Sequence, residues 1–266
     1  MDQQHSESPS VPREEIPGAP VPDLFEQSSG LDLPELPWRV AQSASALAQL
    51  SHHVLAIGPR AARLLARLRG TLAEEGVAAL PVGPAHSWTR ERLGSLGLEV
   101  LDHDPSDVGA TLPFPPERFD LVLVVDAPYD PREVHRVLAP EGLLLAQQRG
   151  PGDLAELGSE GTDDSDDSGG AADSLADHLR RVTEAGLETE HSDTFHGEGR
   201  IETPEGLRAL CEGEGLLVPP TCTADALPLR ITLSRYLVQA RRPSRPAPAR
   251  TDFAEMLDDP LEVPRI

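Results

Sequence analysis

Short apolar runs alternate with stretches of helical periodicity through the middle of this chain, and this alternation constrains the fold more than any other feature. The most continuous runs are HVLAI at His53–Ile57, DLVLVV at Asp120–Val125 and GLLLAQ at Gly142–Gln147. Runs of this length with few polar residues are typical of strands that are covered on both faces. Amphipathic segments such as Ala61–Glu75 separate them. The pattern predicts an α/β domain, Rossmann-like and doubly wound, with a mostly parallel sheet.

Further elements continue this alternation on both sides of the longest runs. Two short strands are predicted at Val77–Pro81 and Leu98–Leu101. Later in the chain, a helix at Leu175–Ala185 precedes a strand near Leu187–Phe195. The last run, ITLSRYLVQ at Ile231–Gln239, alternates in polarity, which predicts a late antiparallel strand at an edge of the sheet.

Three segments lack the apolar residues that a core requires. Residues 1–36 are polar and rich in proline, residues 156–174 hold seven carboxylates and no basic residue, and a Pro/Arg-rich stretch follows Arg241. Such segments bury too little apolar surface to offset the entropy lost on ordering. We therefore expect a disordered amino-terminal segment, one folded domain over 37–240 with an acidic flexible loop, and a tail over 241–266.

Within the tail, the peptide TDFAEMLDDPLEVPRI at 251–266 has an amphipathic pattern. Phe253, Met256 and Leu257 lie at positions i, i+3 and i+4, so one helical turn would gather them on one face. A peptide of this kind on a flexible tether can dock into a groove of another protein. The peptide is therefore a candidate protein-binding segment. The alternative is a frayed tail, or a strip that packs against its own domain.

The formal net charge of −22 argues against several partner classes. Nucleic acids and anionic membranes would be repelled by this excess of acidic residues. No apolar run reaches the ~18 residues of a membrane span, and the first residues do not resemble a signal peptide. Cys211 and Cys222 are too few for a disulfide framework, and His191 and His196 would point to opposite faces of a strand, so no metal site is predicted. These features predict a cytoplasmic protein, and the high proline and arginine content is typical of high-GC bacteria.

Three stretches in chain order resemble the class I S-adenosylmethionine-dependent methyltransferases. Val54–Gly58 (VLAIG) resembles the first strand and glycine loop of the family. Leu112–Val122 (LPFPPERFDLV) is similar to the family's LPFPDGSFDLV, and Glu133–Gly142 (EVHRVLAPEG) to its EVARVLRPGG. The resemblance covers about residues 54–148. It implies a transferase fold that binds S-adenosylmethionine at the carboxyl ends of its strands.

Several positions that hold the cofactor in this family are altered. Ala56 replaces the acid before the glycine loop, and Gly58 is followed by proline instead of further glycines. Pro81 lies where the family offers an acid to the ribose hydroxyls. Each lost charge-assisted hydrogen bond weakens binding by about 1.5–3 kcal/mol. Arg60, at the start of the next helix, would favour a more anionic ligand, or else it is an ordinary solvated helix residue.

Other positions keep the residue types of the family. Asp102 and Asp104 resemble its acidic position beside the adenine amino group. After the fourth strand, Asp126 is a candidate general base and Tyr129 a candidate for stacking on a substrate ring. The alternative is a proline-rich loop in which Asp130 caps the next helix.

Two functional hypotheses follow from this pattern. In the first, the eroded cofactor motifs make the chain a pseudoenzyme, a methyltransferase-like protein that serves as a non-catalytic binding or assembly module. In the second, it is an active S-adenosylmethionine-dependent methyltransferase with a small-molecule acceptor, holding the cofactor through Asp102 or Asp104 and backbone groups. Methyl transfer needs little beyond alignment, so conspicuous catalytic residues are not required. The missing acids and glycines favour the first hypothesis.

Overall fold

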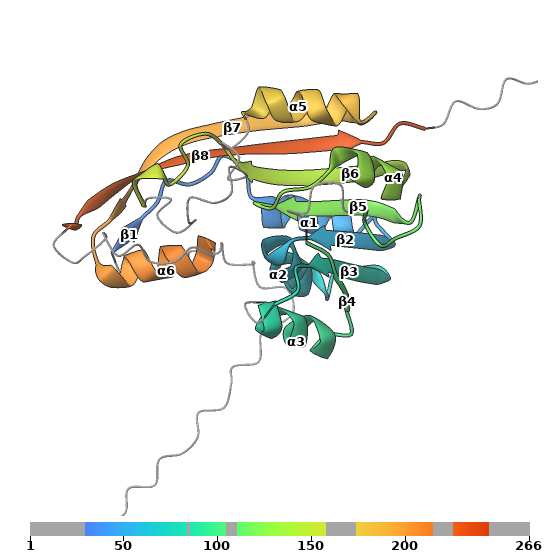
Figure 1. Ribbon diagram of the computed structural model, residues 1–266, viewed down its shortest axis with the longest axis horizontal. Coiled ribbons are helices and arrows are strands. Elements are labelled where there is room, and N and C mark those ends of the chain that lie inside the picture. Colours follow the sequence, from blue (N-terminus) through green and yellow to red (C-terminus); the bar gives the residue numbers. More distant parts are fainter. Residues whose placement is uncertain (1–29, 84–85, 105–110, 158–173, 215–225, 245–266) are drawn as a thin grey trace, which may run out of the picture.

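The sheet at the centre of the molecule has eight strands and is flanked by helices (Figure 1). The strand order is β1-β7-β8-β6-β5-β2-β3-β4. This description rests on a computed structural model that describes residues 30–83, 86–104, 111–157, 174–214 and 226–244. The expected disordered residues 1–29, most of the acidic loop and the peptide 251–266 lie outside this part of the chain.

Five parallel strands form the half of the sheet that sequence periodicity predicts. They are β2 (His53–Ile57), β3 (Glu75–Leu80), β4 (Glu99–Asp102), β5 (Phe119–Val125) and β6 (Leu138–Arg149). β2 pairs with β3 on one side and with β5 on the other. The direction in which successive strands are added to the sheet therefore reverses at β2. In open α/β sheets a ligand crevice lies outside the carboxyl ends of the strands at such a switch point.

The other strands are antiparallel to their neighbours. They are β1 (Leu31–Asp32), β7 (Glu188–Ile201) and β8 (Leu229–Arg241). β8 lies between β6 and β7 and is antiparallel to both, which confirms the late antiparallel strand. β1 lies within the range expected to be disordered, and it forms the outer edge of the sheet beside β7.

The prediction that the last strand lies at an edge is wrong, because β8 is an interior strand. Its polar residues Ser234 and Arg235, which make the sequence alternate, are both buried. The side chain of Arg235 has a partner that offsets the cost of burial. The backbone N–H of Ser234 and the guanidinium of Arg235 both donate to Asp153. Polarity in this strand therefore marks a buried polar contact and not a solvent-facing side.

Helices cover both faces of the sheet, and one further helix lies beneath its far end (Figure 1). α1 (Val40–Ala48), α2 (Pro59–Leu68) and α3 (Ser87–Ser95) contribute to one hydrophobic cluster with Val54 and Ala56 of β2. α4 (Pro131–Val137) and α5 (Leu175–Glu184) contribute to a second cluster, with Leu55 and Ile57 from the opposite face of the same strand. α6 (Pro204–Glu214) packs in a third, with Leu31 of β1 and Ile201 of β7.

Helix ends follow local sequence signals. The Asp130 side chain accepts a hydrogen bond from the Arg132 N–H at 2.9 Å, so it caps α4 as predicted. Thr203 caps α6 in the same way, by accepting from the Gly206 N–H. α2 ends at Leu68, earlier than the predicted Glu75, because Glu75 already begins β3. Among the described helices none is long and apolar enough to cross a membrane.

Candidate functional site

The glycine loop after β2 lies at the switch point of the sheet. Gly58 has a φ of +86°, a conformation that glycine adopts without strain. A Cβ at this position would lie 2.5 Å from Cβ of Ala127, which follows β5. The open side of Gly58 is therefore filled by Ala127. Ala56 is fully buried in β2, beside Ala78 and Leu123 on the neighbouring strands.

Arg60, the second residue of α2, is buried with 8% of its side chain exposed, so it is not an ordinary solvated helix residue. Its guanidinium lies 3.2 Å from a carboxylate oxygen of Asp126 and also pairs with Glu214. These residues belong to a larger group of charged side chains near the carboxyl ends of β5 and β6. The group, called the ion cluster below, consists of Arg60, Asp126, Arg149, Asp153, Glu214 and Arg235.

Asp126, the predicted general base, is held inside the ion cluster. Its side chain has no exposed surface, and its Oδ2 lies 2.8 Å from Nη1 of Arg235 and 3.2 Å from Nη1 of Arg60. The other oxygen, Oδ1, is buried with no hydrogen-bond partner among the described residues. A general base must come within hydrogen-bond distance of the proton it removes. In this arrangement the carboxylate of Asp126 serves as an ion-pair partner.

Glu214, the last residue of α6, is the most highly paired acid of the cluster. Its Oε2 lies 2.6 Å from Nη2 of Arg149 and 3.1 Å from Nη2 of Arg235. Arg60 donates to the same oxygen. Burial by itself would raise the pKa of Glu214, but attraction to the three arginines outweighs burial and lowers this pKa. Glu214 is therefore held in its charged form.

Asp153 shows the opposite balance. It lies in the turn after β6, and its Oδ1 accepts a 2.9 Å hydrogen bond from Nε of Arg235. Burial raises the pKa of Asp153 above its ordinary value, although Arg235 partly offsets the effect. The pKa of Arg235 is raised, because attraction to Asp126, and also to Glu214 and Asp153, outweighs its burial. One cluster thus contains a carboxylate that favours ionisation and another that resists it.

Tyr129 contributes to a different contact on the α5 side of the sheet. Its hydroxyl lies 2.8 Å from Nε2 of His178, whose Nδ1 is 3.3 Å from the hydroxyl of Tyr236. The three rings pack edge to face. Desolvation raises the pKa of Tyr129. The hydroxyl of Tyr129 and the carboxylate of Asp126 therefore have different partners, and the two side chains belong to separate groups of contacts.

Arg90 of α3 spans the ends of β3 and β4, where the family holds the ribose and adenine. It donates to the carbonyl oxygens of Leu80 and Pro81 at 3.0 and 2.9 Å. It also lies 2.6 Å from the carboxylate of Asp102, whose side chain is 64% exposed. Asp104 is exposed nearby. The guanidinium of Arg90 thus binds both the carbonyl oxygen of Pro81 and the carboxylate of Asp102.

The residues present do not fit the cofactor that the resemblance implies. The free side of Gly58 is occupied by Ala127, and the charged groups next to the loop already bind one another. At the ribose end, Arg90 occupies the polar groups at Pro81 and Asp102. The polar groups described at Arg60, Pro81 and Asp102 therefore already have partners within the protein.

Sequence reasoning missed four members of the ion cluster and Arg90. The missed members of the cluster are Arg149, Asp153, Glu214 and Arg235. A usable signal was present for Arg235, because this charged residue directly follows the polar Ser234 and so breaks the alternation of the strand. Glu214 had none, since a glutamate at the end of a helix is ordinarily solvated.

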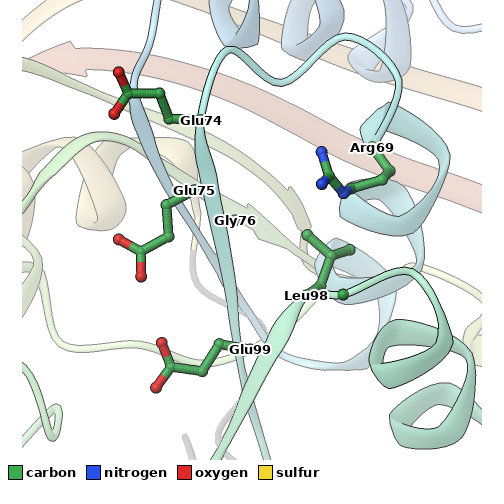
Figure 2. A pocket seen from close by; sticks show the side chains of 7 residues that line it. Arg69, Glu74, Glu75, Gly76, Leu98 and Glu99 are labelled. Atoms are coloured by element: carbon green, nitrogen blue, oxygen red, sulfur yellow. The ribbon is translucent and has the colours of Figure 1, made fainter.

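A separate hollow of about 450 Å³ lies at the opposite, amino ends of the strands (Figure 2). Figure 2 shows the carboxylates of Glu74, Glu75 and Glu99 on one side and Arg69 and Leu98 on the other. Glu75 and Glu99 pair with Arg118. Within the described ranges, no group of histidine, cysteine and carboxylate side chains has the arrangement of a metal site.

No known family model matches the chain, and no curated protein is significantly similar to it in sequence. Solved structures do match. A candidate methyltransferase of Bacillus halodurans has a TM-score of 0.53 at 19% identity, over 77% of this chain and 97% of its own. The YcgJ protein of Bacillus subtilis has a TM-score of 0.55 at 15% identity, over 77% and 99%.

A third match is to the complex between the Haloferax volcanii Trm112 methyltransferase activator and a candidate methyltransferase, with a TM-score of 0.50 at 18% identity over 79% of this chain and 90% of that chain. At such low identities the likeness establishes the fold. It agrees with the strand order, the interior antiparallel strand and the motifs at residues 54–58, 112–122 and 133–142. The chain has the fold of the class I S-adenosylmethionine-dependent methyltransferases.

Proposed function

We propose that this protein is a non-catalytic member of the methyltransferase fold, a binding or assembly module that does not use S-adenosylmethionine as a methyl donor. One observation carries the proposal: the charged side chains between the glycine loop and the end of β5 are buried and paired with one another. The guanidinium of Arg60 and the carboxylate of Asp126 are buried there and paired with each other. In an active enzyme of this fold the same region must hold the reacting groups in alignment.

The other end of the site supports the same proposal. A ribose held by two hydroxyl groups needs an acceptor that is free to bind both. Pro81 supplies only a carbonyl oxygen, which already accepts from Arg90. Filling of the space at Gly58 by Ala127 adds a steric reason at the methionine end. The altered motifs and the side-chain packing thus point in the same direction.

A protein partner is the second part of the proposal. The amphipathic peptide 251–266 is the candidate segment, although it lies outside the described residues. One structural neighbour is a complex between a methyltransferase activator and a candidate methyltransferase. We expect a pull-down from the source cell with the full chain to recover a partner that is not recovered when residues 251–266 are deleted. Identical recovery with both chains would place the interaction elsewhere.

Calorimetric titration with S-adenosylmethionine and S-adenosylhomocysteine tests the non-catalytic proposal. We expect no binding heat up to millimolar ligand from a chain whose cooperative thermal unfolding shows that it is folded. Micromolar binding of either ligand would overturn the proposal.

An active methyltransferase with a small-molecule acceptor is the second candidate, and one observation favours it. The carboxylate of Asp102 remains largely exposed at the end of β4, where the family contacts adenine. If the titration shows binding, Asp102→Asn should weaken it about tenfold. Glu99→Gln, at the opposite end of the same strand, is the matched control and should leave the affinity unchanged.

A further inference from the structure

Three arginines from separate elements converge on one carboxylate oxygen of Glu214. Arg60 comes from α2, Arg149 from the end of β6, and Arg235 from β8. All three donate to or pair with Oε2, and Arg149 also donates to the backbone carbonyl oxygen of Glu214 at 2.9 Å. Guanidinium groups bind carboxylates through charge-assisted hydrogen bonds of fixed direction. The arrangement is that of a carboxylate-binding site.

Glu214 differs from the other acids of the ion cluster in its origin. Asp126 directly follows β5, and Asp153 lies in the turn after β6, so both are placed by loops at the ends of strands. Glu214 is carried by α6, whose apolar residues Leu207 and Leu210 pack in the third hydrophobic cluster, with β1 and β7. Without α6, the cluster holds three positive charges, from Arg60 of α2, Arg149 of β6 and Arg235 of β8, and two negative charges. α6 supplies the last negative charge from its carboxyl end.

The arginines have hydrogen-bonding capacity that the ion cluster does not use. Nε of Arg60 and Nε of Arg149 are buried with no hydrogen-bond partner among the described residues, and Nε of Arg149 lies at an ion-pair distance of 3.8 Å from Oδ2 of Asp153. A buried donor left without a partner is costly. A carboxylate that reaches these donors would therefore gain hydrogen bonds that Glu214 does not make.

We propose that Arg60, Arg149 and Arg235 form a binding site for the carboxylate of a small organic acid, and that Glu214 is the internal carboxylate that occupies this site in the absence of the acid. Exchange keeps the charges of the cluster balanced, because one carboxylate replaces another. It also returns the buried Glu214 side chain to water, which recovers its hydration. The ligand is small because the side chains of Arg60 and Arg235 are nearly inaccessible. Arg149, at 27% exposed, marks the point of entry.

Removal of the internal carboxylate provides the test. In Glu214→Ala, sodium formate should raise the melting temperature saturably, by about 3 °C at ten times its dissociation constant, compared with sodium chloride at equal ionic strength. The matched control is Glu205→Ala, which removes an exposed glutamate from the same helix. This variant retains Glu214 and should respond to formate as the native chain does.

The native chain gives the second comparison. Formate must displace Glu214 there, so its apparent affinity should be at least tenfold weaker than in Glu214→Ala. Equal affinity in both chains would overturn the proposal, as would a folded Glu214→Ala that does not distinguish formate from chloride.

A variant that folds only in formate would support the proposal. If Glu214→Ala folds in neither salt, Glu214→Gln provides the test, because it retains the side-chain shape and lacks the charge. A formate-specific rise in the melting temperature of this variant is expected, and its absence would overturn the proposal. Because the probe is formate, the result does not depend on whether the protein binds S-adenosylmethionine.

Discussion

The two ends of the parallel strands carry networks of similar charged groups with opposite burial. At the carboxyl ends, the six side chains of the ion cluster are nearly all inaccessible, and each acid contacts one or more guanidinium groups. At the amino ends, Glu74, Glu75 and Glu99 line the hollow with partly exposed side chains (Figure 2), and they pair with His52 and Arg118. Residue types alone do not distinguish these networks.

The difference in burial decides what each network contributes. An exposed ion pair contributes little to stability, because water and salt screen it. A buried pair is expensive to form, and loss of one partner leaves the other charged without compensation. The carboxyl-end network therefore determines which groups remain free to bind a ligand. Substitutions in the amino-end network are expected to change the stability of the fold and the site only slightly.

The largest expected effect comes from Arg235. Arg235→Gln leaves Asp126 and Asp153 buried without their common cation, and should lower the free energy of unfolding by about 3–5 kcal/mol. Urea denaturation at neutral pH measures this change. The control is Arg230→Gln on the same strand, whose side chain is 82% exposed and pairs with an exposed glutamate. It should remain within experimental error of the native chain. Similar losses in both variants would show that burial does not separate the two kinds of ion pair.

A smaller effect is expected in the pH dependence of stability, to which Glu214 and Asp153 should contribute in opposite directions. The lowered pKa of Glu214 means that its charged form stabilises the fold above the ordinary value of 4.5, and that this contribution is lost as pH falls through the lowered pKa. Glu214→Gln should therefore show a shallower loss of stability on the acid side. Urea denaturation at a series of acidic pH values measures it.

Asp153 has the opposite sign in the same experiment. Its raised pKa means that its contribution is fully present below the ordinary value of 3.8 and is lost as pH rises through the raised pKa. Asp153→Asn should remove this loss, so its stability should decline less than that of the native chain over that interval. Parallel pH profiles for the two variants would contradict the opposed pKa directions.

The smallest measurable effect is expected at the amino ends of the strands, at Asp120, whose carboxylate accepts hydrogen bonds from backbone N–H groups. Oδ2 of Asp120 accepts from the backbone N–H groups of His52 and His53 at 2.9 and 3.0 Å. Asp120→Ala should reduce the free energy of unfolding by about 1 kcal/mol, because the side chain is partly exposed and water replaces some of the lost bonds. Glu74→Ala, which removes only an exposed pair with His52, is the control. An equal response from Glu74→Ala would mean that the backbone bonds of Asp120 carry no special weight.

Local sequence patterns account for most of the architecture. Continuous apolar runs predicted β2 and β5, and the motifs at residues 54–58, 112–122 and 133–142 predicted the methyltransferase fold. Asp130 was identified as a helix cap from its position before Pro131. These features depend on residues near one another in the chain, so periodicity and spacing suffice to detect them.

The candidate site could be predicted only in part from local sequence patterns. Ala56, Gly58 and Pro81 were placed at the strand ends by their alignment with the family, and Arg60 was singled out as a cation near the loop. The partners of Arg60 were not identified, because Glu214 is 154 residues away along the chain. For Tyr129, the contact with His178 is likewise formed by elements far apart in sequence.

The amino-acid sequence by itself thus determined the strand–helix alternation and the methyltransferase fold. Only the tertiary structure decided that β8 is interior and that its arginine joins two acids from other loops. Burial and long-range pairing also decided that Asp126 is an ion-pair partner and that Glu214 meets three arginines. The physical reason is that desolvation and charge interaction depend on all the elements that surround a group, whereas periodicity reports only on the element that carries it.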